Sequence, residues 1–213
     1  FGHGFLLNRG QKESKSLGNV TDPLELAETY GVDALRYFLL REVAFGQDGS
    51  YSPEAIVNRC NAELANSFGN LAQRTLSMIF KNMDGELEVV SSNDDADSAL
   101  AETVSDACTV LQSKFESLAF SDGLEAWMKA VYACNQYVDD QAPWTLKKTD
   151  EHRMRIVLLT LFKQVRSLAI AVRPVVPTAA NMLLDQMGIP AEERDYDALS
   201  DDGWLERLIQ TRF

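Results

Sequence analysis

A short stretch near the start of the chain combines the residue types that hold phosphate groups. Between Gly10 and Gly18 lie two lysines and two serines, namely Lys12, Ser14, Lys15 and Ser16. Ammonium and hydroxyl groups donate the hydrogen bonds that polyphosphate oxygens accept, and the glycines open backbone conformations closed to other residues. Residues 8–19 therefore predict a phosphate-binding loop, although on composition alone a solvated surface loop is the commoner interpretation.

The segments on either side of this loop predict how it is held. Residues 1–7 are apolar and aromatic, which indicates a buried strand leading into the loop. His3 lies there between glycines, where it either faces a nucleotide or, as is commoner, packs with a hydrogen bond. After the loop, Asp22 suits a helix cap and Pro23 suits a first helical turn. A helix is expected to begin there and to end at Gly31.

The rest of the chain predicts a mainly α fold. A helix from Val32 to near Phe45 and a turn through residues 46–51 come first. Apolar positions then recur at helical spacing. They predict helices over residues 53–80, 95–119, 121–138, 149–173 and 178–187, with interruptions at Gly69 and at residues 141–144. The tail is expected to fold back through Trp204, Leu205 and Leu208. The count indicates an antiparallel helix bundle over residues 51–213, preceded by a separate unit over residues 1–50.

Composition narrows the class of protein. The 213 residues carry a formal net charge of −12, which argues against binding DNA or RNA through a broad basic surface, because such binding depends on neutralised phosphates. No apolar run approaches the roughly 20 residues that span a bilayer, so we expect no membrane segment and no signal peptide. Because the first residue is Phe1, we expect some upstream sequence to be missing.

The cysteines and histidines form no metal-binding pattern. Cys60, Cys108 and Cys134 are odd in number, far apart and set in apolar helical stretches. This favours reduced core thiols in a cytoplasmic protein over a disulfide framework. His3 and His152 are remote from each other and from every cysteine, so we expect no metal site in the chain.

Several motifs resemble those of a known family. The strand, the loop and the following sequences GNV and DPxxLxxxYGxDxxRYFLL resemble the C-terminal end of the catalytic core in class I aminoacyl-tRNA synthetases, whose loop reads Lys-Met-Ser-Lys-Ser. Three further segments, in this order, resemble methionyl-tRNA synthetases of the bacterial type. They are FGQDG at residues 45–49, GNLAQR at residues 69–74 and DQAPW at residues 140–144. The resemblance covers nearly the whole chain.

The resemblance implies a fold and a reaction. The end of a class I Rossmann-type core would precede a helical anticodon-binding domain. Methionine and ATP would form methionyl-adenylate and pyrophosphate, and the methionyl group would then pass to the terminal ribose of methionine tRNA. Lys15 would carry chemistry by holding pyrophosphate oxygens as charge builds on them, and Lys12, Ser14 and Ser16 would bind ATP with it. Magnesium would accompany the ATP and needs no protein cage in this chain.

The resemblance also assigns Asn70, Arg74 and Trp144 to the anticodon. Positions four apart on a helix share one face, so Asn70 and Arg74 project together. Trp144 follows Pro143 at a predicted helix break, where its ring can stay exposed. RNA bases stack on rings and guanidinium planes and form hydrogen bonds through their edges, and such stacking needs no basic patch. Without the family, an Asn/Arg pair is ordinarily helix surface and a tryptophan ordinarily core.

Two features depart from the family pattern. Glu13 stands where the family has methionine, and a carboxylate close to triphosphate would repel it. We expect Glu13 to point to solvent or to pair with a neighbouring lysine, the alternative being a loop of altered activity. The family's other nucleotide-binding element, His-x-Gly-His, and its methionine pocket do not occur in these residues.

Two functions remain. The chain is either the C-terminal half of a synthetase of this family or a stand-alone tRNA-binding or helical interaction module without ligation activity. Another class I synthetase would leave Asn70, Arg74 and Trp144 unexplained.

Overall fold

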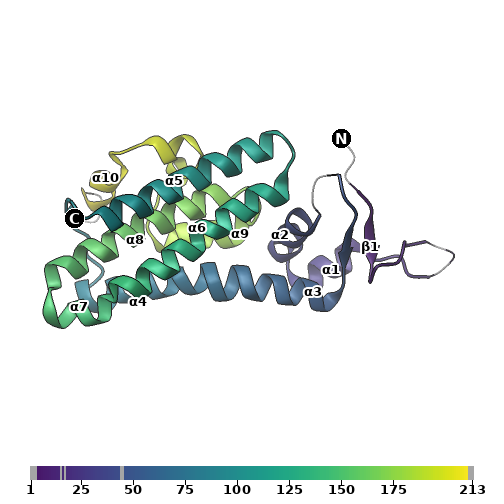
Figure 1. The fold of residues 1–213 in the computed structure, drawn as a ribbon, viewed down its shortest axis with the longest axis horizontal. Coiled ribbons are helices and arrows are strands. Elements are labelled where there is room, and N and C mark those ends of the chain that lie inside the picture. Colours follow the sequence, from purple (N-terminus) through teal and green to yellow (C-terminus); the bar gives the residue numbers. More distant parts are fainter. Residues whose placement is uncertain (1–3, 15, 17, 44–45, 211–213) are drawn as a thin grey trace.

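The structure is a computed structural model that describes residues 4–14, 16, 18–43 and 46–210. It is elongated and mostly helical, with a helix bundle at one end and a small part that contains two strands at the other (Figure 1). The predicted mainly α fold is therefore confirmed. Within the described ranges, none of the helices combines the length and the apolar character needed to cross a bilayer.

The small part is built on two short parallel strands. Strand β1 (Leu6–Asn8) pairs with β2 (Gly49–Tyr51), and helices α1 (Pro23–Tyr30) and α2 (Val32–Glu42) lie between them in sequence. The prediction of a turn throughout residues 46–51 is wrong for its last three residues, which form β2. A strand this short is specified by its partner, which lies far away in the sequence, and leaves no local pattern.

The predicted signals around α1 are confirmed. Asp22 Oδ1 accepts the backbone N–H of Leu24 at 2.8 Å, which caps the first turn. Gly31 has a φ of 87° and ends the helix, a conformation that glycine adopts without steric cost. Helix α2 follows at once and ends at Glu42. Its predicted end near Phe45 lies outside the described residues.

One long helical rod runs from the small part into the bundle (Figure 1). It consists of α3 (Pro53–Arg59), a π-helix (Cys60–Gly69) and α4 (Asn70–Met83). Gly69 does not interrupt it as predicted, because its φ of −62° is helical. A side chain there would come within 3.1 Å of the Leu64 carbonyl oxygen, so the glycine allows the tight backbone packing at the end of the π-helix.

Four helices pack with α4 to form the bundle. They are α5 (Asp95–Glu116), α6 (Phe120–Gln141), α8 (Glu151–Val172) and α9 (Pro177–Gln186). Helices α5 and α6 pack along each other and both pack against α8, most of whose residues are buried. The fully buried Trp127 of α6 donates its indole N–H to the Leu168 carbonyl of α8 at 3.0 Å. The core therefore lies around α8.

Two short helices complete the ends of the bundle. The prediction of a simple break at residues 141–144 is incomplete, because α7 (Pro143–Thr149) begins directly after Ala142, whose φ is 43°. Proline suits a first helical position, where its missing N–H costs no hydrogen bond. The predicted return of the tail is confirmed by α10 (Trp204–Gln210). The ring of Trp204 stacks on that of Phe162 of α8, with 6.1 Å between the ring centres.

A buried polar network joins the small part to the bundle. Glu63, on the π-helix, accepts hydrogen bonds from Tyr37 Oη at 2.6 Å, Arg59 Nη1 at 3.0 Å and Arg41 Nε at 3.3 Å. Arg41 also pairs with Glu125 of α6. Burial, and then the Glu63 carboxylate, raise the pKa of Tyr37 well above its ordinary range. The Glu63 carboxylate therefore ties α2 and α3 to the π-helix, and Arg41 extends this link to α6 through Glu125.

A second link connects α2 to the corner between α8 and α9. Asp33 Oδ2 accepts the backbone N–H of Ala179 in the first turn of α9 at 2.7 Å. Arg36 donates to the carbonyl oxygens of Pro174 at 2.7 Å and Val175 at 3.0 Å. The two links fix the position of the small part on the bundle.

Candidate functional site

The candidate phosphate loop begins with a tight turn directly after β1. Asn8 and Gln11 exchange two backbone hydrogen bonds of 2.9 Å each. Arg9 and Gly10 between them have φ values of 49° and 78°, as both central residues of a type I′ turn require. This turn fixes the point at which the loop leaves the strand.

Asn19 closes the loop on itself. Its Oδ1 accepts the backbone N–H of Ser14 at 2.9 Å, and its Nδ2 donates to the Lys12 carbonyl at 3.3 Å. Both residues that it holds are predicted phosphate ligands. These two hydrogen bonds therefore brace the loop from within.

The predicted donors lie along the same loop. Lys12 and Ser16 are exposed, and Ser14 Oγ lies 3.0 Å from Ser16 Oγ. Lys12 Nζ is 5.1 Å from the ring centre of Phe5, within the range of a cation–π contact. The predicted catalytic Lys15 lies outside the described residues, and so does His3.

Glu13 is half-buried and does not simply point to solvent. Its partners among the described residues are hydroxyl groups, and Lys15, one of its two neighbouring lysines, lies outside those residues. Glu13 Oε1 accepts hydrogen bonds from Tyr51 Oη at 2.5 Å and Thr21 Oγ1 at 2.7 Å. The Tyr51 hydroxyl, and then that of Thr21, lower the pKa of this carboxyl. The sequence did not predict these hydroxyl partners, because Tyr51 belongs to β2, a strand that left no local pattern.

The second candidate site lies at the opposite end of the long axis, where α4, α6 and α7 meet (Figure 1). The Arg74 guanidinium carbon is 5.7 Å from the ring centre of Trp144, and 49% of Trp144 is exposed. The exposure predicted for this ring is confirmed. Arg74 Nη2 also forms an ion pair of 2.7 Å with Asp139 of α6. A cation and a large ring are thus presented together to solvent.

Asn70 completes the predicted set on the same helix. It is exposed at the first position of α4, one turn before Arg74 and on the same face. The structure thus brings Arg74 and Trp144 into contact and leaves Asn70 one turn along the helix. All three residues belong to elements of the bundle.

A buried ion pair holds the corner that carries Trp144. Arg153 of α8 donates to the Asp97 carboxylate at 2.6 and 2.7 Å, and Tyr137 donates to it at 2.5 Å. Arg153 also donates to Gln141, the last residue of α6, at 2.7 Å. Gln141 stands three positions before Trp144, so the pair fixes the chain where α6 gives way to α7.

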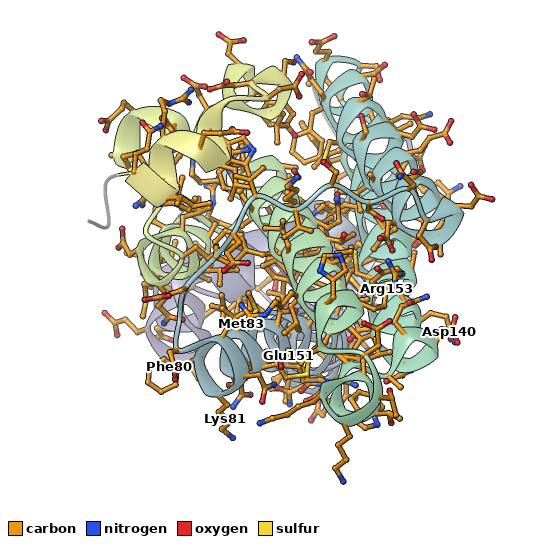
Figure 2. The ribbon with its side chains drawn as sticks, turned by 90° about the vertical axis from the view of Figure 1, so that its left-hand side faces the viewer. Phe80, Lys81, Met83, Asp140, Glu151 and Arg153 are labelled. Atoms are coloured by element: carbon orange, nitrogen blue, oxygen red, sulfur yellow. The ribbon has the colours of Figure 1, made fainter. Side chains whose placement is uncertain are left out.

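Figure 2 looks onto this end of the bundle, where Phe80 and Lys81 project outward from the end of α4 and Asp140 from the end of α6. Lys147 of α7 donates to Asn82 of α4 at 2.8 Å. This contact adds a second tie between the helices that carry Arg74 and Trp144. The end surface is therefore of mixed charge with exposed aromatic side chains.

Sequence reasoning missed three residues of these sites. Thr21 and Tyr51, which bind Glu13, carried no signal of their own. Asp139 stands next to Asp140, and adjacent carboxylates are ordinarily only a solvated surface; Asp140 accepts a hydrogen bond from Gln136 at 2.8 Å. The available hint was the position of Asp139, five residues before a tryptophan that was expected to be exposed.

The cysteines have no chemical role in these sites. Cys60, Cys108 and Cys134 are free thiols. Burial raises the pKa of Cys108 and of Cys134 to about 12, which keeps both thiols protonated and unreactive near neutral pH. Among the residues that the structure describes, no group of three or more His, Cys, Asp or Glu side chains is placed to hold a metal ion.

Comparisons with protein families divide the chain in two. Residues 1–76 match the family "tRNA synthetases class I (M)". Residues 89–210 match the "Anticodon binding domain of methionyl tRNA ligase". The first match contains the loop, and the second contains Trp144.

Individual relatives agree with these matches. Methionine–tRNA ligase of Brucella suis is 49% identical over 196 residues, which are 92% of this chain and 38% of the relative. That of Mycobacterium leprae is 46% identical over 204 residues, which are 94% of this chain and 38% of the relative. The chain thus spans about two fifths of the length of these relatives.

Solved structures of one relative superpose closely. Methionyl-tRNA synthetase of Mycobacterium tuberculosis in complex with methionyl-adenylate is 46% identical and gives a TM-score of 0.88. Its apo form is 42% identical and gives a TM-score of 0.84. The matches cover 93% of this chain and 40% and 39% of those chains.

Proposed function

The chain belongs to the methionyl-tRNA ligase family, and we propose that it is the C-terminal part of a methionine–tRNA ligase. The whole protein would activate methionine with ATP and transfer it to methionine tRNA. The stand-alone module is the less supported alternative, since both parts of the chain match the synthetase, in the same order.

The loop supplies the phosphate-binding half of this proposal. Lys12, Ser14 and Ser16 would bind ATP, and Lys15 would hold the pyrophosphate oxygens as they gain charge. A donor that meets charge developing in the transition state accelerates the reaction without tightening substrate binding equally. Mg²⁺ would arrive with the ATP and screen its phosphates. The brace from Asn19 supports these roles, because it orders the backbone on both sides of Glu13.

The bundle supplies the RNA-binding half. The observation that carries this proposal is the contact between Arg74 and the half-exposed Trp144, at the end of the molecule far from the loop. A guanidinium plane and an indole ring can each stack on a base, and Asn70 adds an amide that can form hydrogen bonds with a base edge. We propose that the three residues read the anticodon of methionine tRNA.

The small part and the bundle have separate apolar cores. A small cluster of Phe38, Tyr51 and Ile56 lies in the part that bears the loop, apart from the large core of the bundle. We place the boundary between catalytic core and anticodon-binding domain at residues 50 and 51, which leaves Tyr51 and Ile56 of this cluster on the side of the anticodon-binding domain. The three free thiols, two of them buried, favour a cytoplasmic protein.

Methionine-dependent exchange of pyrophosphate into ATP tests the proposal. We expect the intact protein to catalyse this exchange and to charge methionine tRNA. The 213-residue chain alone should catalyse none, because its sequence holds only one of the two nucleotide-binding elements. Exchange by this chain above a blank, or activation of another amino acid by the intact protein, would contradict the assignment. An intact protein that binds the tRNA but activates no amino acid would favour the stand-alone module.

A further inference from the structure

Glu13 is tied to the body of the small part by two hydroxyl groups. Tyr51 on β2 and Thr21 before α1 both donate to its Oε1, at 2.5 and 2.7 Å. Asn8 Nδ2, at the end of β1, lies 3.4 Å from Thr21 Oγ1. One chain of polar contacts therefore joins the middle of the loop to both of its ends and to the strand beside it.

A small apolar cavity adjoins the carboxylate. It has a volume of about 210 Å³ and is lined chiefly by apolar side chains such as Leu26, Phe38 and Ile56. A methionine can fill such a space by packing alone, whereas a carboxylate needs hydrogen-bond donors. Thr21 and Tyr51, which also line the cavity, provide them.

We propose that Glu13 is a positioning residue that anchors the phosphate loop, doing by hydrogen bonds what an apolar side chain at this position does by packing. Its neighbours Lys12 and Ser14 are candidate phosphate ligands, and Asn19 holds the backbone of both. Fixing Glu13 therefore fixes the backbone from which their donors project. Only the catalytic consequence of the anchor rests on the proposed function.

Amide exchange in the intact protein tests the anchor without requiring activity. In Glu13→Ala and in Tyr51→Phe, peptides spanning residues 10–19 should exchange faster by about tenfold or more, the factor expected for one net hydrogen bond to a charged group. Glu13→Met should keep the loop protected by filling the cavity. The matched control is Tyr30→Phe, because Tyr30 packs on the same small cluster and its hydroxyl makes no hydrogen bond among the described residues.

Peptides from α8 serve as an internal standard for folding. If they remain protected while the loop exchanges as in the wild type in both Glu13→Ala and Tyr51→Phe, the anchor does not exist. If Tyr30→Phe loosens the loop as much as Tyr51→Phe, the effect belongs to the cluster and the anchor is again refuted.

Kinetics separate a positioning role from a purely structural one. In the intact enzyme, Glu13→Ala should lower kcat/KM for ATP in pyrophosphate exchange by about tenfold, leave KM for methionine unchanged, and be rescued by Glu13→Met. An equal loss for both substrates, or no rescue, would contradict positioning. If the wild type shows no exchange while loop protection responds as predicted, the anchor stands and the proposed function fails.

Discussion

The Arg74 guanidinium carbon on α4 lies 5.7 Å from the Trp144 ring centre on α7, and Arg74 is also paired at 2.7 Å with Asp139 on α6. The same arginine therefore contacts a ring that can stack on a base and a carboxylate that repels phosphate. Asp139 is 59% exposed at its side chain, so solvent already weakens the pair. RNA would compete with Asp139 for this guanidinium.

We expect Asp139→Asn to lower KM for methionine tRNA by about two- to fivefold, because exposed ion pairs are worth about 0.2–1 kcal/mol. The measurement is aminoacylation by the intact enzyme as a function of tRNA concentration. Asp140→Asn is the matched control, since Asp140 accepts a hydrogen bond from Gln136 while Arg74 pairs with Asp139. A weaker affinity for tRNA in Asp139→Asn would show that the carboxylate orients Arg74 for binding.

Lys15→Ala should reduce the rate of adenylation by about 10²–10³, the usual loss when one donor to developing charge is removed. KM for methionine should change little, because this lysine meets pyrophosphate and not the amino acid. Single-turnover formation of methionyl-adenylate by the intact enzyme measures the effect. Lys129→Ala, a change of an exposed lysine on α6, provides the control. Normal turnover with poor methionine affinity would refute the role given to Lys15.

Asp97→Asn should destabilise the protein by about 2 kcal/mol at neutral pH, within the range for hydrogen bonds between charged groups. Burial by itself raises the pKa of Asp97, but the bonds from Arg153, Ser92 and Tyr137 outweigh it and leave that pKa lowered. The carboxylate therefore contributes stability above the ordinary aspartate pKa of about 3.9, and this contribution is lost as pH falls through the lowered value.

Urea unfolding of the wild type and of Asp97→Asn from pH 7 down to pH 3 measures this dependence. The difference in unfolding free energy should be largest at neutral pH and should shrink in acid. Asp95→Asn, an exposed change in the same helical turn, should show no such trend. A difference that is constant with pH would mean that Asp97 acts by shape and not by charge.

The sequence predicted what depends on local patterns. The two ends of α1 were predicted from Asp22, Pro23 and Gly31, because helix capping and positive φ are properties of one or two residues. The long helices followed from apolar spacing, and the family resemblance, confirmed by both family matches, came from short motifs. These features need no knowledge of which segments meet in space.

Contacts between distant segments could not be predicted in this way. Strand β2 exists because β1 lies beside it, and with β2 unseen the Tyr51 partner of Glu13 was unseen as well. The pairing of Arg74 with Asp139 likewise depends on how α4 packs near α6. Within the anticodon set, spacing alone placed Asn70 beside Arg74, whereas the contact with Trp144 required the fold.

The central claim is that this end of the bundle reads the anticodon while the loop at the other end serves chemistry. It is tested most directly by comparing tRNA charging with pyrophosphate exchange in Trp144→Ala of the intact enzyme. Losing a base stack worth about 1–3 kcal/mol should cut kcat/KM for methionine tRNA by about tenfold or more.

Pyrophosphate exchange should remain at the wild-type rate in the same preparation. Tyr132→Ala, which removes an equally exposed ring from α6, should leave both activities intact. If exchange falls in parallel with charging in Trp144→Ala, the tryptophan supports the fold and not the anticodon, and the account is wrong.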